Sequence, residues 1–170
     1  MASLLMLRTT AGMSRLFAGK KLRQRMPPFS PPLTLLSLSG VLEKEGHHVQ
    51  ALDLMFEKDP IKSLSRVLPS IDAIILNIFS EGQDSSQALV QFIKKQCPEI
   101  PIIIEGIYCS NNAEKALEII PADVCILGEG EDIIGQIIKR IQEEDDLSRI
   151  PGVLFRENGI VTKGEPTKEI

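Results

Sequence analysis

Short apolar runs alternate with helical patterns along most of the chain, and this alternation constrains the fold more than any other feature. Each run has the length of a strand, and leucine or isoleucine recurs at helical spacing in the stretch after it. The expected strands cover residues 3–8, 49–54, 72–79, 101–104 and 123–127, and the expected helices begin near residues 30, 60, 85, 112 and 131. We therefore predict an α/β, doubly wound, flavodoxin-like (Rossmann-like) five-stranded parallel sheet in the order 2-1-3-4-5.

Composition narrows the class of protein. The chain has 170 residues, of which 43% are hydrophobic, and this suits a globular domain with a sizeable core. The net charge of −4 gives no bulk attraction to nucleic acid or to an anionic membrane, and no apolar run has the length of a membrane span. The three cysteines are an odd number in strand-like or loop contexts, which favours reduced thiols and a cytoplasmic location.

The first 42 residues carry six basic side chains and no acidic one. A targeting peptide has this composition, and so does a first strand followed by a long basic loop. We favour a strand over residues 3–8 and a loop over residues 9–30, because the predicted sheet needs a first strand and no other segment supplies it.

The pattern changes after Asp146. Two short apolar runs flank Glu157-Asn158-Gly159, and Asn-Gly between such runs is a strong signal for a β-hairpin. We predict a domain over residues 1–146, followed by a linker and hairpin appendage over residues 147–170.

The fifth expected strand ends in Gly128-Glu129-Gly130-Glu131, and a helical pattern follows at once. Glycines let a ligand approach the backbone, and the first turn of a helix offers free N–H groups. Ligands of open parallel sheets bind beyond the carboxyl ends of the strands, so this loop is a candidate ligand-facing segment.

The sequence disfavours three common classes of domain that have such a sheet. A phosphorelay receiver needs carboxylates after its first and third strands and a lysine after its fifth, and this chain has none of them there. The dinucleotide fingerprint must follow the first strand, but the paired glycines here follow the fifth. No phosphate-binding P-loop motif is present.

A better match comes from several segments in order. Residues 31–38 begin Pro-Pro-Leu, residues 41–49 read Val-Leu-Glu-Lys-Glu-Gly-His-His-Val, residues 126–131 read Ile-Leu-Gly-Glu-Gly-Glu, and residues 150–159 begin Ile-Pro-Gly-Val. This set resembles the cobalamin-binding domain of cobalamin-dependent radical SAM proteins and the linker towards their radical domain. The resemblance covers nearly the whole chain and implies the same doubly wound fold, with cobalamin as the cofactor.

The chain departs from that family at several positions. It lacks the C-x-x-x-C-x-x-C motif, so we expect no iron–sulfur cluster in this chain and no cleavage of S-adenosylmethionine by it alone. It also lacks the D-x-H-x-x-G motif whose histidine ligates cobalt in methyl-transferring relatives. The family's S-x-L element reads Asn77-Ile78-Phe79, and its Gly-Gly pair reads Glu105-Gly106.

The resemblance implies a cofactor site in the loops after the strands, with the nucleotide tail of cobalamin inserted among them and the corrin ring above. The expected cofactor-binding residues are Thr9, Thr10, Asn77, Phe79, Ser80, Gly106, Ile107, Tyr108, Gly128, Glu129, Gly130 and Glu131; no catalytic residue and no protein metal ligand is expected. The chain would act with a separate or missing radical SAM catalytic domain. Two alternatives stay open: a degenerate domain that serves as an interaction or regulatory module, and a nucleotide-type ligand in the same crevice.

Overall fold

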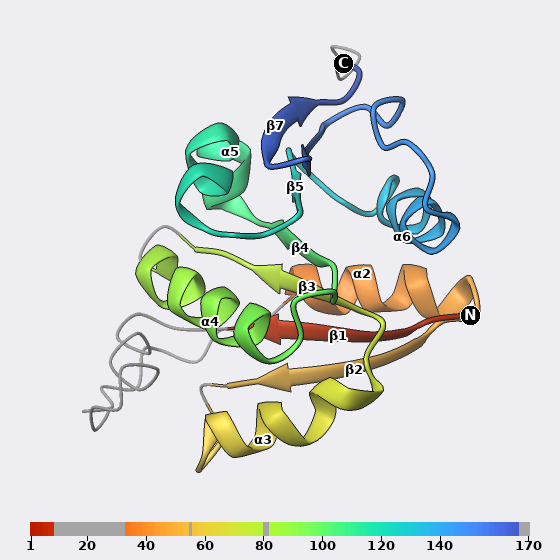
Figure 1. Ribbon diagram of the computed structural model, residues 1–170. Helices are drawn as coiled ribbons and strands as arrows, with labels where there is room; N and C mark the ends of the chain where they lie inside the picture. The colour runs from red at the N-terminus through yellow and green to blue at the C-terminus, as the bar shows by residue number, and fades with distance from the viewer. Residues whose placement is uncertain (9–32, 55, 80–81, 167–170) are drawn as a thin grey trace.

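The computed structural model describes residues 1–8, 33–54, 56–79 and 82–166, and these build one mixed sheet with helices on both faces (Figure 1). The strands are β1 (Ser3–Arg8), β2 (His48–Asp53), β3 (Ala73–Asn77), β4 (Ile102–Glu105), β5 (Val124–Ile126), β6 (Val153–Glu157) and β7 (Ile160–Lys163). The helices are α2 (Leu33–Lys44), α3 (Pro60–Val67), the 3₁₀ helix η1 (Leu68–Ser70), α4 (Gln83–Gln96), α5 (Ile107–Ile119) and α6 (Ile134–Glu143).

The five-stranded parallel core is confirmed. The sheet order is β2-β1-β3-β4-β5-β6-β7, and the pairs from β2 to β5 are all parallel. The N-terminal segment forms β1 between β2 and β3, so the strand interpretation of residues 3–8 is also confirmed. The basic loop expected over residues 9–30 lies outside the described residues.

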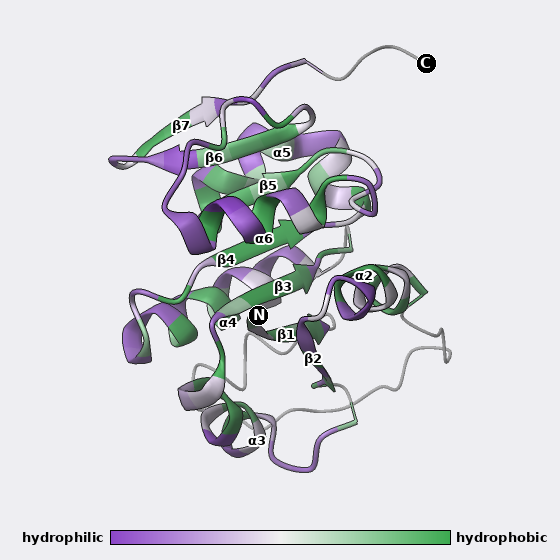
Figure 2. Cartoon of the chain, turned by 90° about the vertical axis from the view of Figure 1, so that its right-hand side faces the viewer, coloured by the Kyte–Doolittle hydropathy of each residue, from purple (hydrophilic) through white to green (hydrophobic). Residues whose placement is uncertain are grey.

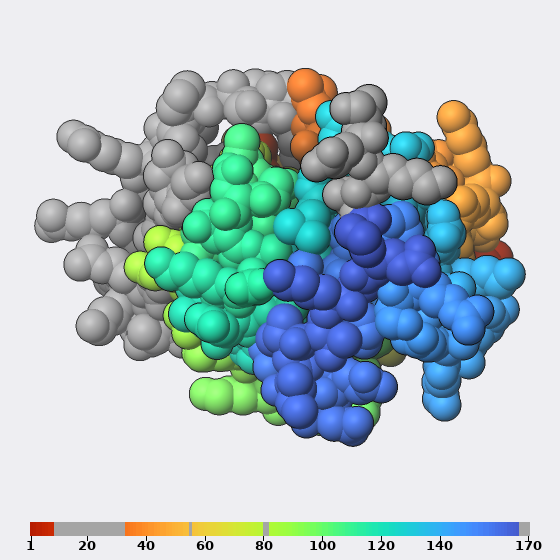
Figure 3. Space-filling model, turned by 90° about the horizontal axis from the view of Figure 1, so that it is seen from above, coloured from red at the N-terminus to blue at the C-terminus, as the bar shows by residue number. Residues whose placement is uncertain are grey.

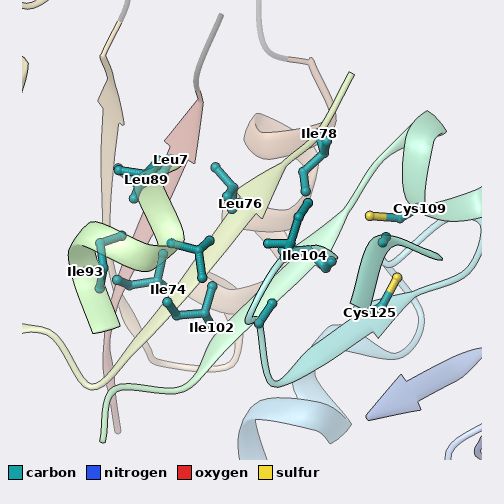
Figure 4. Close-up of a cluster of buried hydrophobic side chains, with 14 of the residues drawn as sticks. Leu7, Ile74, Leu76, Ile78, Leu89, Ile93, Ile102, Ile104, Cys109 and Cys125 are labelled. Atoms are coloured by element: carbon teal, nitrogen blue, oxygen red, sulfur yellow. The ribbon is translucent and has the colours of Figure 1, made fainter. Parts of the chain in front are cut away.

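Each face of the sheet has its own core. Leu5 and Leu7 of β1 point to the face covered by α3, α4 and α5, while Leu4 and Met6 point to the face covered by α2 and α6. Figure 4 shows the first core, in which isoleucines of β3 and β4 pack against α4 and α5. The inner strands are hydrophobic along their length (Figure 2), as expected for strands buried on both faces.

The C-terminal hairpin belongs to the sheet. β6 pairs antiparallel with β5, and β7 pairs antiparallel with β6. The predicted Asn-Gly turn is confirmed: Asn158 and Gly159 have φ values of 51° and 82°, the positive values that a two-residue type I′ hairpin requires. Figure 3 shows the hairpin, in blue, lying against α5.

Helix boundaries mostly follow local signals. Asp59 caps α3, because its Oδ1 accepts a hydrogen bond from Lys62 N at 3.1 Å, and Pro60 occupies the first turn. The helix expected from residue 112 instead begins at Ile107 and is kinked at Asn112. In the described part of the chain, no helix is both long and apolar enough to cross a membrane.

Candidate functional site

The parallel strands end at one edge of the sheet, on the left of Figure 1 for β1, β2 and β3, and their last residues form a polar row there. Asp53, Arg8, Asn77 and Glu105 end β2, β1, β3 and β4, and the register places each beside the next. We call these four residues the terminal row. In-register side chains of parallel strands share a face, and this row continues the face covered by α2 and α6.

Asn77 and Glu105 form the central pair of the terminal row. Asn77 Nδ2 donates a hydrogen bond to Glu105 Oε1 at 2.6 Å, and only 5% and 1% of the two residues is exposed. Burial raises the pKa of Glu105 from 4.5 to about 7; the Asn77 hydrogen bond lowers this pKa, and the nearby charge of Glu131 raises it. Burial therefore favours the protonated, neutral form of Glu105.

Arg8 and Asp53 form the other half of the terminal row. Arg8 Nη2 lies 2.6 Å from Asp53 Oδ2, and the arginine is buried. Neither residue was among the expected cofactor-binding residues. Arg8 and Asp53 are polar residues that end apolar runs in the sequence. This signal identifies them as neighbours once the strand register is known.

Gly106 allows the exits of β3 and β4 to approach closely. Its φ is +107°, and a Cβ atom there would lie 2.8 Å from both Asn77 Nδ2 and Ile78 O. Two backbone hydrogen bonds join the same segments: Ile78 N donates to Glu105 O at 2.8 Å, and Tyr108 N donates to Ile78 O at 3.3 Å. The conformation of Gly106 thus serves strand packing.

Exposed apolar side chains follow the same two strands. Phe79, after β3, is 45% exposed, and Ile107, after β4, is 59% exposed. Tyr108, the residue after Ile107, is buried in the first turn of α5, and its hydroxyl has no hydrogen-bond partner among the described residues. Burial also raises the pKa of this hydroxyl. The edge therefore offers apolar surface next to an unsatisfied polar group.

The loop after β5 has an open side and a buried side. Gly128 has a φ of +77° with open space where a Cβ would stand, and its N–H donates to Ser110 Oγ at 3.0 Å. Glu129 is exposed. Gly130 is buried, and a Cβ there would lie 3.3 Å from Leu38 Cδ2, in the core under α2. Only the first part of the Gly-Glu-Gly-Glu segment therefore faces outwards.

Glu131, the last residue of this loop, lies near Glu105 of the terminal row. Its Oε2 is buried without a hydrogen-bond partner in the described part of the chain, and its charge acts on Glu105. The structure thus brings Asn77, Phe79, Gly106, Ile107, Tyr108 and the 128–131 loop to one edge. Thr9, Thr10 and Ser80 lie outside the described residues.

The cysteines occupy other surroundings. Cys109 of α5 and Cys125 of β5 are both buried in the core shown in Figure 4, and Cys97 follows α4. A hydrogen bond with Cys125, together with burial, raises the pKa of the Cys109 thiol, so it stays protonated. Across the residues that the structure describes, no three His, Cys, Asp or Glu side chains are grouped to hold a metal ion.

A separate groove of about 480 Å³ lies between the first half of α5, the exit of β5 and the hairpin. Its lining includes Ser110, Asn111, Leu127, Val153, Lys163 and Glu165. At its rim Lys163 pairs with Glu114 at 2.5 Å, and both side chains are more than half exposed. Such an exposed pair contributes little to stability.

The doubly wound sheet and the polar row at its strand exits define an α/β domain of the class whose members bind ligands at the carboxyl edge of the sheet. A family model described as the B12 binding domain matches residues 19–138, which is most of the chain. The chain therefore belongs to the B12-binding domain family.

A curated relative is similar over most of the chain, and two solved structures are similar over nearly all of it. An anaerobic magnesium-protoporphyrin IX monomethyl ester cyclase from Synechocystis sp. is 28% identical over 148 residues, which cover 82% of this chain and 29% of the relative. The radical S-adenosylmethionine methyltransferase TsrM from Kitasatospora setae, with cobalamin and a [4Fe-4S] cluster bound, matches with a TM-score of 0.80 at 19% identity, over 98% of this chain and 29% of that one. The cobalamin-dependent radical enzyme OxsB, with aqua-cobalamin and S-adenosylmethionine bound, matches with a TM-score of 0.75 at 17% identity, over 99% of this chain and 23% of that one.

These two structural similarities, at under 25% identity, describe the fold. The chain spans less than a third of the length of each of these three proteins.

Proposed function

We propose that this protein binds a corrinoid of the cobalamin class at the carboxyl edge of its sheet. Cobalamin is a flat corrin ring edged with amide side chains, and one arm carries a phosphodiester, a ribose and a benzimidazole base. The observation that carries the proposal is the content of the exits of β3 and β4: Phe79 and Ile107 are exposed there, and the hydroxyl of Tyr108, the next residue, has no hydrogen-bond partner among the described residues. The apolar side chains suit the ring face, and the hydroxyl suits an amide at its edge.

The residues present fit the ring on three grounds. Gly128 has open space where a Cβ would stand, so the loop backbone can approach a ligand. Glu131 Oε2 offers a second unsatisfied acceptor, suited to an amide N–H. The raised pKa of Glu105, at about 7, reduces the negative charge beneath the ring. When bound, the cobalt supplies the group-transfer or redox chemistry, and the protein supplies binding and orientation.

We further propose that the module acts with a radical SAM catalytic domain. The support is the family match together with relatives more than three times as long as the matched segment. The 1–146 and 147–170 division remains a prediction.

The test is titration with hydroxocobalamin and with aquocobinamide, followed by visible absorption. Ile107→Asp places a charge on the proposed ring surface and should weaken corrinoid binding about tenfold or more. The fold should tolerate it, because an acidic residue suits the first turn of α5. The matched control is Ile160→Asp, since Ile160 is 70% exposed on the hairpin, away from the strand exits, and its replacement should leave the affinity unchanged.

Equal weakening by both substitutions, or none by Ile107→Asp, would remove Ile107 from the site. If the wild-type protein binds neither corrinoid, the interaction-module alternative gains support. The exposed leucines Leu33 and Leu36 at the start of α2 are the specific observation in its favour.

A further inference from the structure

Buried side chains fill the space at the ends of the two central strands. Asn77 and Glu105 end the two central strands β3 and β4, and both are almost fully buried. Their 2.6 Å hydrogen bond spans the gap between the strands on the face covered by α2 and α6. A ligand arm entering here would have to displace a hydrogen-bonded pair.

The backbone closes the same exits. Ile78 N donates to Glu105 O, and Tyr108 N donates to Ile78 O. The backbone at Gly106 is so close that a Cβ there would lie 2.8 Å from both Asn77 Nδ2 and Ile78 O. Side-chain rotation alone therefore cannot open a passage between β3 and β4, because these backbone hydrogen bonds would have to break.

The flanking positions on this face are filled as well. On one side Arg8 pairs with Asp53 and is buried. On the other side Gly130 is buried, and a Cβ there would lie 3.3 Å from Leu38 Cδ2 and 3.4 Å from Ile126 Cδ1. The described strand exits from β2 to β5 therefore present a packed surface on the α2 and α6 face.

Charge also opposes an inserted arm. The arm of cobalamin carries a phosphodiester, which is an anion. Glu105 and Glu131 lie close enough to influence each other, and either one, when ionised, would repel that phosphate. A bare corrin ring carries no phosphate and needs no volume below the edge.

We propose that this edge selects a corrinoid without a nucleotide arm over cobalamin itself, and that Asn77 and Glu105 determine the selectivity by filling the space that the arm needs. This inference rests on the proposed function. Specificity is a difference between two affinities, and a steric and charged block at this edge lowers the affinity for the corrinoid that carries the arm.

The test compares equilibrium dialysis of aquocobinamide, which lacks the nucleotide arm, with that of hydroxocobalamin. The wild-type protein should bind aquocobinamide about tenfold more tightly or better. The double variant Asn77→Ser, Glu105→Gly removes both side chains and should reduce this preference about tenfold, by a gain in hydroxocobalamin affinity. Aquocobinamide binding should change little, because the ring surface is untouched.

Two further variants separate volume from charge and from stability. Glu105→Gln removes the charge but keeps the volume, so it should retain most of the preference. Asp123→Asn weakens a hydrogen bond at the opposite end of β4, where Asp123 Oδ2 accepts from Ile102 N at 2.7 Å, and should leave the preference unchanged. Circular dichroism establishes folding, and Glu105→Ala replaces the double variant if the latter unfolds.

Three outcomes overturn the inference. If the wild-type protein binds both corrinoids equally, or hydroxocobalamin better, the proposed function stands and the selectivity is wrong. If the folded space-opening variant keeps the wild-type preference, Asn77 and Glu105 do not cause it. If neither corrinoid binds, the proposed function itself fails, and the selectivity fails with it.

Discussion

Asn77 Nδ2 donates a 2.6 Å hydrogen bond to Glu105 Oε1, and this contact joins the last residues of the two central strands beneath the candidate site. It holds a carboxyl group in the protein interior beside a neutral amide. Burial raises the pKa of this carboxyl to about 7, so the edge of the sheet changes charge near neutral pH. Stability is therefore linked to one proton at this edge of the sheet.

Stability should depend on pH through Glu105. Its pKa is raised from 4.5 to about 7 on folding, so the folded state binds more protons between these values than the unfolded state does. The free energy of unfolding should therefore fall as pH rises from 4.5 to 7, by about 3 kcal/mol. Urea unfolding across this pH range measures it, and the reference is Glu105→Gln, which lacks the titrating group. Parallel curves for the two proteins would show that Glu105 titrates normally.

Gly106 and Gly128 should respond differently to alanine. Both have positive φ values, +107° and +77°, so backbone strain burdens both substitutions. A Cβ at Gly106 would also meet the Ile78 carbonyl oxygen at 2.8 Å, whereas a Cβ at Gly128 meets nothing within 4 Å. We expect a loss of about 1 kcal/mol for Gly128→Ala and about 3 kcal/mol or more for Gly106→Ala, measured by denaturant unfolding. Equal losses would mean that the β3 and β4 exits can separate.

Gly130→Val should act on the fold. The nearest neighbours of a Cβ at this position are Leu38 Cδ2 at 3.3 Å and Ile126 Cδ1 at 3.4 Å, both core side chains. A branched side chain overfills that space, and we expect the thermal unfolding midpoint to drop for a loss of about 1–3 kcal/mol. An unchanged midpoint with lost corrinoid binding would instead place Gly130 at the ligand surface.

The three cysteines should differ in how fast their thiols react in the native protein. Cys109 and Cys125 are buried, and their mutual hydrogen bond raises the pKa of the Cys109 thiol, whereas Cys97 is partly exposed. A chromogenic disulfide reagent should modify one thiol quickly in the native protein and the remaining two only after unfolding. Cys97→Ser is the control and should abolish the fast phase. A fast phase that persists in this variant would contradict the burial of the other two.

Local patterns determined the elements and their order. The mostly apolar run of residues 72–79 has the length and composition of a strand that is buried on both faces. Asn158-Gly159 favours a two-residue turn whatever surrounds it. Regular alternation of strands and helices, with right-handed crossovers, then leaves few sheet orders, and the predicted order of the parallel strands is the one observed. The predicted edge for the ligand site follows from that order alone.

Tertiary packing decided the details at that edge. No local signal in residues 105–112 predicts that α5 begins at Ile107. The start of the helix depends on the close approach of β3 and β4 at Gly106, which is a long-range contact. Gly130 is buried because α2 packs over it, although its sequence neighbours Gly128 and Glu129 are exposed.

The terminal row is likewise a product of register. Arg8, Asp53, Asn77 and Glu105 are far apart along the chain, and they become neighbours only when four strands align. The sequence by itself thus determined the fold and the edge at which a ligand is expected, because both depend on periodicity. Only the tertiary structure decided which side chains fill that edge and which remain open, because long-range contacts fix strand register and burial.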